Sequence, residues 1–257
     1  MSVQLLEIPG GISFYHTSEE ESRWLYDEIV KDHCYDIGQL PSDPFIIDIG
    51  ANIGLYCLYI KKTYPAAQIL AFEPAPESVS ILRQNLALHK ISGVETHTCA
   101  LGSKTDTQIL TFFPNTPSNA TLFSDEKDKY LDLIANEVSQ DIADRMSHGA
   151  RQYPVSVKRL SQFLQGRVDF QKIDLIKIDV EGGELEVLRG IDDEHWPLIQ
   201  NIVMEVWDSS GQLGDAEKFL TTKGFIVESA LVPWINGRAE TLKMYMVKAR
   251  RSILNAK

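Results

Sequence analysis

Carboxylate side chains follow three short apolar runs of the sequence, and each stands beside small or turn-forming residues. Asp48 ends the first run, Glu73 follows the second and Asp179 follows the third. A carboxylate can attract a cationic ligand group, accept hydrogen bonds from hydroxyl groups or take up a proton. In open α/β sheets, ligands bind beyond the carboxyl ends of the strands. The sequence therefore predicts one ligand site built around these acids.

The loop after the first run reads DIGANIG at residues 48–54. Glycines let the backbone turn sharply and approach a ligand, and the following helix offers free N–H groups. A dinucleotide loop has the pattern G-x-G-x-x-G, whereas this loop has only Gly50 and Gly54, and Asp48 would repel a phosphate. The pattern D-x-G-x-x-x-G is similar to that of class I S-adenosylmethionine-dependent methyltransferases, whose cofactor is cationic and carries no phosphate. Asp48, Gly50, Ala51, Asn52 and Gly54 are therefore predicted to bind this cofactor, the alternative being a tight turn without a ligand.

The second motif places an acid where a nucleoside ribose is bound. Glu73 comes 19 residues after Gly54 and ends an apolar run. An acid about 20 residues after the glycine loop is positioned to accept hydrogen bonds from ribose hydroxyls. Pro74, beside Glu73, is predicted to contact the cofactor as well. Ala100 and Leu101, at the end of the third predicted strand, are expected to flank the adenine.

In the third motif, DLIKIDVEGGELEVLRG at residues 174–190, an apolar strand is followed by two acids, two glycines and a helix. Lys177 and Asp179 share one side of this strand because side chains alternate along it. Glu181 follows closely, and Glu205 lies near the end of the next apolar run. Acids gathered at neighbouring strand ends have raised pKa values and are candidates for a base or an ion site. The alternative is that they only cap loops.

The elements that position these residues follow an α/β rhythm from residue 45 onward. Apolar runs at 45–49, 69–72, 94–98, 175–178, 202–206 and 225–227 alternate with helical patterns at about 54–63, 76–90, 183–190 and 214–223. This alternation predicts a doubly wound, mostly parallel sheet covered by helices on both faces. Residues 243–248 predict a final strand, which we expect at the edge of the sheet, antiparallel to the strand before it.

Two parts of the chain depart from this rhythm. Residues 1–44 are predicted to form an N-terminal lead-in with a helix at 19–31, capped by Ser18. Residues 45–257 then form one methyltransferase-like domain. Within it, the charged segment 114–153 predicts either solvated surface helices or a lid over a pocket, because long insertions in compact domains are often lids.

Composition excludes several classes of protein. The formal charge is −11, from 36 acidic and 25 basic residues, which opposes binding to nucleic acid or to an anionic membrane. No apolar run approaches the ~18 residues of a membrane span, and the N-terminus lacks a signal-peptide pattern. Three cysteines without a CxxC pair predict neither disulfides nor a zinc site, and Cys57 and Cys99 are expected in the core. We therefore expect a cytoplasmic protein.

The motifs agree in order and spacing with those of the FkbM family of S-adenosylmethionine-dependent methyltransferases, which the chain resembles over roughly residues 20–250. The resemblance is carried by DIGANIG (48–54), AFEPAPES (71–78), LIKIDVEGGELEVLRGI (175–191) and NIVMEV (201–206). It is greatest to the FkbM-type domains of polyketide and nonribosomal peptide assembly lines, which share the stretch at 22–35 and the Trp-Pro pair at 196–197. The resemblance implies a Rossmann-like class I methyltransferase fold with an antiparallel C-terminal strand.

Two short stretches differ from the pattern of those relatives. Where many have Glu-Val-His-Asp, this chain has Glu-Val-Trp-Asp at 205–208, and where many have Glu-Lys-Ser-Glu it has Glu-Gly-Gly-Glu at 181–184. Trp207 thus replaces a histidine that would be a candidate base.

The activity that the resemblance implies is O-methylation, in which a hydroxyl group must lose its proton to a general base. Asp179, Glu181 and Glu205 are the candidates, and Asp179 is also predicted to contact the cofactor. Of the histidines we favour His148, which the lid would carry toward the pocket. The three acids could instead hold a divalent cation, but we assign no metal ligand.

Three functions remain open at this stage. The favoured acceptor is a hydroxyl of a polyketide or peptidyl intermediate bound to an acyl carrier protein, for which Arg145, Arg151, Lys158 and Arg159 could form a docking patch. The first alternative is a sugar or glycolipid hydroxyl. The second is a non-catalytic scaffold that keeps the cofactor fold. The sequence does not indicate an oligomeric state.

Overall fold

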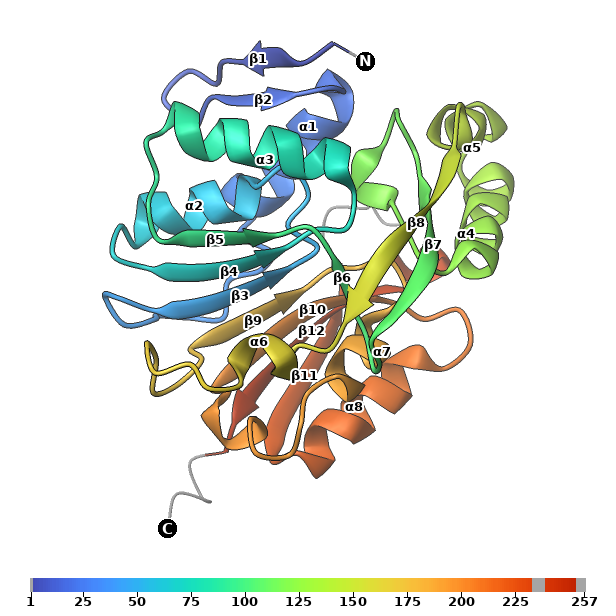
Figure 1. Ribbon diagram of the computed structural model, residues 1–257. Coiled ribbons are helices and arrows are strands. Elements are labelled where there is room, and N and C mark those ends of the chain that lie inside the picture. Colours follow the sequence, from blue (N-terminus) through green and yellow to red (C-terminus); the bar gives the residue numbers. More distant parts are fainter. Residues whose placement is uncertain (1, 233–238, 253–257) are drawn as a thin grey trace.

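The computed structural model describes residues 2–232 and 239–252, and a central sheet of seven strands forms its middle layer (Figure 1). The strand order is β11-β12-β10-β9-β3-β4-β5. The strands are β3 (Phe45–Ile49), β4 (Gln68–Phe72), β5 (Val94–His97), β9 (Leu175–Ile178), β10 (Asn201–Trp207), β11 (Phe225–Leu231) and β12 (Met244–Arg251). Strands β10, β9, β3, β4 and β5 pair in parallel. The predicted doubly wound, mostly parallel α/β fold is therefore confirmed.

The C-terminal strand β12 is antiparallel, as predicted, but its predicted place at the sheet edge is wrong. It lies between β10 and β11 and pairs with both along its length. Val247 and Ala249 of β12 are fully buried and belong to the hydrophobic cluster that includes Ala216 and Leu220 of α8. The edge is therefore β11, and the turn predicted between these two strands lies at residues outside those the structure describes.

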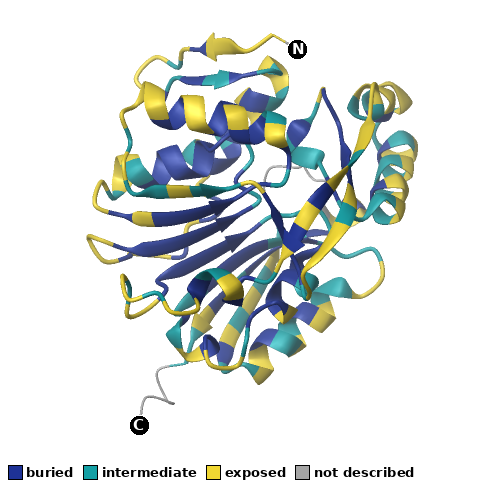
Figure 2. Cartoon of the chain, in the orientation of Figure 1, coloured by how far each residue is buried: buried dark blue, intermediate teal, exposed yellow. Residues whose placement is uncertain are grey.

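Helices cover both faces of the sheet (Figure 1). On one face lie α1 (Glu19–Tyr26), α2 (Leu55–Thr63) and α3 (Pro76–Leu88), and on the other lie α6 (Ser161–Leu164), α7 (Glu184–Arg189) and α8 (Gln212–Thr222). Two hydrophobic clusters form between these layers. The middle strands of the sheet are buried along most of their length (Figure 2), which explains why their sequences read as continuous apolar runs.

The N-terminal lead-in packs against the same layer as α2 and α3. It contains the hairpin of β1 (Gln4–Leu6) and β2 (Phe14–His16), and α1 continues into a π-helical segment at Asp27–Lys31. Fully buried Asn85 of α3 holds β2, since its side chain accepts from the backbone N–H of Tyr15 at 2.6 Å and donates to the carbonyl of Ile53 at 2.8 Å. The lead-in is thus tied to the loop after β3.

The segment between β5 and β9 builds a second, smaller sheet beyond the carboxyl ends of the main strands (Figure 1). Its strands are β6 (Ala100–Leu101), β7 (Asp106–Phe112) and β8 (Arg151–Lys158), with α4 (Ser124–Glu137) and α5 (Gln140–Ser147) inserted between β7 and β8. Short 3-10 turns occur at Pro117–Asn119 and Trp196–Leu198, and α9 spans Ala239–Leu242. Strand β8 was not predicted because it is largely polar and contains Pro154, a residue that disfavours strands. In the described ranges no helix combines the length and the apolar character needed to span a membrane.

Candidate active site

The loop after β3 is packed so closely that only glycine fits at two positions. Gly50 has a φ of +81°, and a Cβ there would lie 1.7 Å from the carbonyl oxygen of Asp179. Gly54 has a φ of +86°, and its Cβ would lie 2.9 Å from Leu82 Cγ. Residues with a Cβ strongly disfavour the positive φ values of both positions. The loop therefore presses its backbone against the end of β9, as the predicted glycine motif requires.

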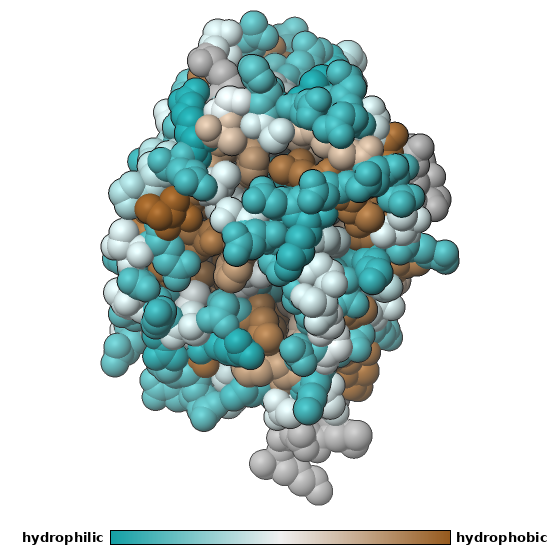
Figure 3. Space-filling view, turned by 90° about the vertical axis from the view of Figure 1, so that its right-hand side faces the viewer, coloured by the Kyte–Doolittle hydropathy of each residue, from teal (hydrophilic) through white to brown (hydrophobic). Residues whose placement is uncertain are grey.

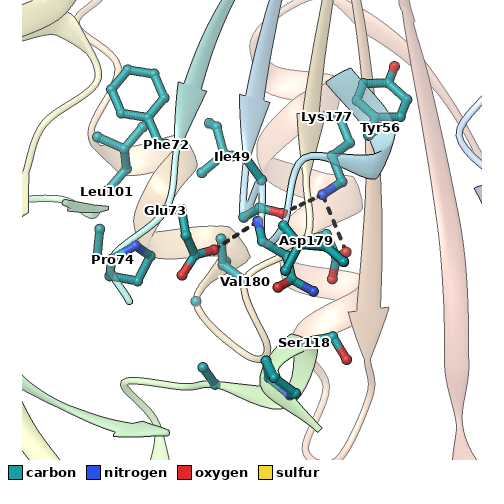
Figure 4. A pocket seen from close by; sticks show the side chains of 18 of the residues that line it. Ile49, Tyr56, Phe72, Glu73, Pro74, Leu101, Ser118, Lys177, Asp179 and Val180 are labelled. Carbon is teal, nitrogen blue, oxygen red and sulfur yellow. Dashed lines mark hydrogen bonds and ion pairs between the residues drawn. The ribbon is translucent and has the colours of Figure 1, made fainter. Parts of the chain in front are cut away.

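Glu73, at the end of β4, fixes this loop and faces a narrow cavity of about 70 Å³. Its carboxylate accepts hydrogen bonds from the backbone N–H groups of Asn52 at 2.9 Å and Ala75 at 2.8 Å. Only 6% of the residue is exposed, and burial raises its pKa to about 7 despite these donors. The same cavity is lined by several other residues that the sequence had suggested, namely Gly50, Ala51, Asn52, Pro74, Ala100, Leu101 and Asp179 (Figure 4).

Asp48 does not reach this cavity, contrary to the prediction that it binds the ligand. It is 0% exposed, and its carboxylate lies 3.3 Å from Lys177 Nζ and accepts from Cys57 Sγ at 3.3 Å. The reason is the register of the sheet, which sets Asp48 directly beside Lys177 of β9. Lys177 also donates to the carbonyl of Gly50 at 2.8 Å, so Asp48 supports the loop indirectly. Gly54 likewise shapes the loop without lining the cavity.

A wide cavity of about 690 Å³ lies beside the narrow one, between α1, α4, α5 and the ends of β9 and β10. Leu25, Ser118 and Asp179 line both cavities. The face of the molecule that carries α4 and α5 shows apolar side chains recessed between hydrophilic ones (Figure 3). Asp179 therefore stands at the junction of a narrow site and a wide site.

Asp179 is linked to two residues of the lead-in that sequence reasoning missed. Tyr35 Oη lies 3.1 Å from Asp179 Oδ2 and 2.9 Å from Glu28 Oε1. Lys177 Nζ lies 3.4 Å from Asp179 Oδ2 (Figure 4). Burial would lower the pKa of Lys177, but the carboxylates of Asp48 and Asp179 outweigh it and raise that pKa. The signal that could have found Glu28 is an acid between Leu25 and Ile29, on the apolar side of a helix.

Glu181 and Glu205 also line the wide cavity, at the ends of β9 and β10. Glu181 Oε2 lies 2.5 Å from Nζ of Lys127, a buried residue of α4 whose Nζ also donates to Asn119. Burial raises the pKa of Glu181, and Lys127 only partly offsets it. Burial and the nearby carboxylates of Glu28 and Asp179 raise the pKa of Glu205.

The three acids do not converge on one point as a metal site would require. Within residues 2–232 and 239–252, the set of carboxylate and imidazole ligand atoms within 4.8 Å of one another belongs to Asp192, Glu194 and His195, which line neither cavity. The positive charges near the cavity acids are instead the ammonium groups of Lys127 and Lys177.

His148 is exposed at the C-terminal end of α5 and lines neither cavity, so the structure does not bring it to the site. Helix α5 turns Ile142 and Met146 toward the wide cavity instead. Trp207 lines that cavity too and packs edge-on against Tyr130, with ring centroids 5.4 Å apart. Of the candidate bases named from the sequence, those that line the wide cavity are the carboxylates of Asp179, Glu181 and Glu205.

Part of the segment 114–153 forms a wall of the wide cavity, and its action as a lid stays a prediction. Tyr130 and Ile134 of α4 line the cavity, as do Asn115 and Thr116 of the preceding loop. Cys57 and Cys99 are buried free thiols, as predicted.

Comparisons with known proteins agree with this geometry. The model of the methyltransferase FkbM domain matches residues 48–227. Methyltransferase sdnD of Sordaria araneosa is 46% identical over 231 residues, which cover 87% of this chain and 89% of that protein. The 31-O-demethyl-FK506 methyltransferase FkbM of Streptomyces tacrolimicus is 31% identical over 261 residues, covering 97% and 98%.

The fold is shared with a solved structure as well. A methyltransferase FkbM from Methylobacillus flagellatus has a TM-score of 0.52 and 15% identity, over 82% of this chain and 45% of that one. The seven-stranded sheet with its inserted antiparallel strand is accordingly the fold of class I methyltransferases. By its motifs, its sheet and the match over most of its length, the chain belongs to the FkbM family of methyltransferases.

Proposed function

We propose that the protein binds S-adenosylmethionine in the narrow cavity and methylates a hydroxyl group of an acceptor in the wide cavity. The observation that carries this proposal is the position of Asp179, which lines both cavities at their junction. S-adenosylmethionine would supply a methyl group already activated by its sulfonium. What remains for the protein is to place the acceptor oxygen and take up its proton.

The walls of the narrow cavity fit this cofactor. The Glu73 carboxylate retains lone pairs for ribose hydroxyls after accepting from two backbone N–H groups. Ala100 and Leu101 offer apolar contact for an adenine. The cation of the lining, Lys177, is already paired with Asp48 and Asp179. The carboxylate of Asp179 lies at the end nearest the acceptor, where it suits a cationic ligand.

Asp179 is the proposed general base. Its carboxylate is partly accessible, whereas those of Glu28, Glu73 and Asp48 are buried. The acceptor oxygen would lie beside it in the wide cavity, and loss of the O–H proton to Asp179 would leave an electron pair for bond formation. O-methylation also agrees with the printed name of the relative that acts on 31-O-demethyl-FK506.

For the acceptor, we propose a polyketide or peptidyl intermediate delivered by an acyl carrier protein. In the predicted docking patch, Arg145 lies 3.6 Å from carboxylate oxygens of Glu20 and Asp141, and Arg159 lies 2.6 Å from Asp192. Arg151 and Lys158 are exposed, and a carrier would use these two charges.

A sugar hydroxyl is the second candidate, and the lining of the wide cavity favours it. Tyr130 and Trp207 present aromatic rings beside the carboxyl groups of Glu181 and Glu205. Aromatic faces and carboxylates are the groups that pack against a sugar ring and bind its hydroxyls.

Two measurements test these proposals. Calorimetry should detect S-adenosylmethionine binding, and absence of binding at millimolar cofactor would favour a non-catalytic scaffold. Transfer of a labelled methyl group to a hydroxyacyl carrier protein and to glycosides, assayed in parallel, separates the two acceptors. The variant Asp179→Asn should lose about 100-fold or more in kcat, a larger effect than its loss of affinity for the cofactor, whereas His148→Ala should keep full activity.

A further inference from the structure

Tyr35 sits between two carboxyl groups but has only one proton to donate. Its hydroxyl oxygen lies 2.9 Å from Glu28 Oε1 and 3.1 Å from Asp179 Oδ2, both within hydrogen-bonding distance. Only 3% of Tyr35 and 2% of Glu28 are exposed, so water does not supply a missing partner easily. Both contacts are hydrogen bonds only if one of the two carboxyl groups is protonated and donates to the tyrosine oxygen.

The surroundings show which carboxyl group holds that proton. Asp179 lies 3.4 Å from the ammonium of Lys177 and is partly accessible, which favours its charged form. Glu28 is enclosed, and the groups around it are mostly acidic or neutral, namely Tyr35, Cys34, Asp179, Glu181 and Glu205, with Lys177 as the cation. Burial, reinforced by the charge of Asp179, raises the pKa of Glu28 to about 8.

We propose that Glu28 is a positioning residue that, through Tyr35, holds Asp179 ready to accept the proton of the acceptor hydroxyl. Protonated Glu28 donates to the Tyr35 oxygen, and the Tyr35 hydroxyl donates to Asp179. In the reaction the O–H bond of the acceptor breaks, its proton passes to a free lone pair of Asp179, and the electron pair stays on the acceptor oxygen. Glu28 and Tyr35 keep their protons, and Asp179 later releases to solvent the proton that it accepted.

The π-helical segment explains how Glu28 comes to this place. Glu28 is the second residue of that segment, which follows α1 directly. A π-helical turn adds a residue to the helix, changes the direction of the side chains after it and is frequent at functional sites. The chain then returns at Tyr35, whose ring lies against the ring of Tyr56, 5.8 Å between centroids. Tyr35, which contacts Asp179, and Glu28, which contacts Tyr35, are thus both supplied by the short lead-in.

The order of donors predicts a specific pH dependence. Above the pKa of Glu28 its carboxylate competes with Asp179 for the single proton of Tyr35, and Asp179 loses its orientation. The kcat of the wild-type protein should therefore fall as pH rises through about 8. In Glu28→Gln the amide donates to Tyr35 at every pH, so the ratio of kcat at pH 9 to kcat at pH 7 should be higher than in the wild type and this fall should disappear.

Two further variants separate positioning from structure. Tyr35→Phe removes the donor to Asp179 and should lower kcat on the order of 10- to 100-fold, with the dissociation constant of S-adenosylmethionine unchanged. Tyr153→Phe is the matched control, because Tyr153 also donates to a glutamate, Glu77, at 2.9 Å but lines neither cavity. Its kcat should equal that of the wild type.

The proton on Glu28 can be measured without turnover, which matters because the inference rests on the proposed function. In the ¹³C NMR titration of glutamate carboxyl carbons, the wild type should show a signal that titrates near 8 and is missing in Glu28→Gln. Burial also raises the pKa of Glu21 to about 8, and the signal of Glu21 should stay in both proteins. Titration of Glu28 near 4.5, or an unchanged fall of kcat above pH 8 in Glu28→Gln, would overturn the inference. Absence of methyl transfer by the wild type would instead refute the proposed function, and the titration would still report where the proton resides.

Discussion

The carboxylate of Glu73 both holds the loop after β3 and faces the narrow cavity. It accepts from the backbone of Asn52 and Ala75, and it also lines the narrow cavity. Because burial raises its pKa to about 7 in the ligand-free protein, binding of ribose hydroxyls should favour the ionised form. Affinity for S-adenosylmethionine should therefore increase as pH rises through about 7, with release of a proton on binding below that pH.

Calorimetry in buffers of different ionisation enthalpy measures both the affinity and the released proton. The variant Glu73→Gln should bind about 10- to 100-fold more weakly, since hydrogen bonds to a charged group contribute about 1.5–3 kcal/mol, and its affinity should not change across this pH range. A wild-type affinity that is flat with pH would contradict the assignment of Glu73.

Sequence patterns predict some residues of the site and not others. Glu73 and Asp179 could be predicted because each follows an apolar run at the carboxyl end of a strand, where the structure places them. Asp48 could not be assigned correctly, because its partner Lys177 is set by the register of two strands far apart in the chain. Glu28 and Tyr35 lie in the stretch 22–35 that shares in the family resemblance, but no pattern there assigns them a role, which depends on how the lead-in folds back onto β9.

Among the secondary-structure elements, helix α4 is held over the wide cavity by the ammonium group of one of its buried lysines. Lys127 Nζ lies 2.5 Å from Glu181 Oε2 and donates to Asn119 at 2.9 Å. Removing one partner of a buried ion pair leaves an uncompensated charge and is strongly destabilising. The variant Lys127→Met should therefore loosen α4 and make its backbone amides exchange with solvent at least about 10-fold faster.

Hydrogen–deuterium exchange read by mass spectrometry measures this effect helix by helix. Lys129→Met is the control, because Lys129 lies on the same helix but is exposed and pairs with Glu126 at the surface. Exchange in the control should match the wild type. Equal protection of α4 in both variants would mean that the Lys127 contact does not hold the helix in place.

The strands of the main sheet could be predicted closely, whereas the smaller sheet could not. Strands buried on both faces produce apolar runs that stand out in the sequence, and all seven main strands overlap predicted runs. Strands β7 and β8 have exposed polar residues along much of their length. Their pairing stems from contacts across the insertion of α4 and α5, which no local pattern reveals.

For the whole molecule, the buried acids predict how stability depends on pH. Burial raises the pKa of Glu28 to about 8 and those of Glu73 and Glu184 to about 7, from 4.5. The folded protein therefore binds more protons than the unfolded chain between about pH 4.5 and 8, and its free energy of unfolding should fall as pH rises through this window.

Urea denaturation of the ligand-free protein at several pH values measures this slope. Each unit of pKa difference corresponds to about 1.4 kcal/mol, so the three glutamates together should change the free energy of unfolding by on the order of 10 kcal/mol if each contributes in full. Glu28→Gln should show a smaller change than the wild type. Stability that rises from pH 5 to 8 would contradict the protonation of these acids in the folded state.

The inserted strand β12 has a consequence for synthesis on the ribosome. It is the latest of the described strands in chain order, and it fills a gap between two strands made before it. Its Lys248 and Arg250 side chains also donate to the carbonyls of Asp36 and Ile37, just after Tyr35. A nascent chain that has emerged only as far as β11 therefore lacks the strand that joins β11 to β10 and these two contacts with the lead-in, so we expect the sheet to be complete only after β12 leaves the exit tunnel.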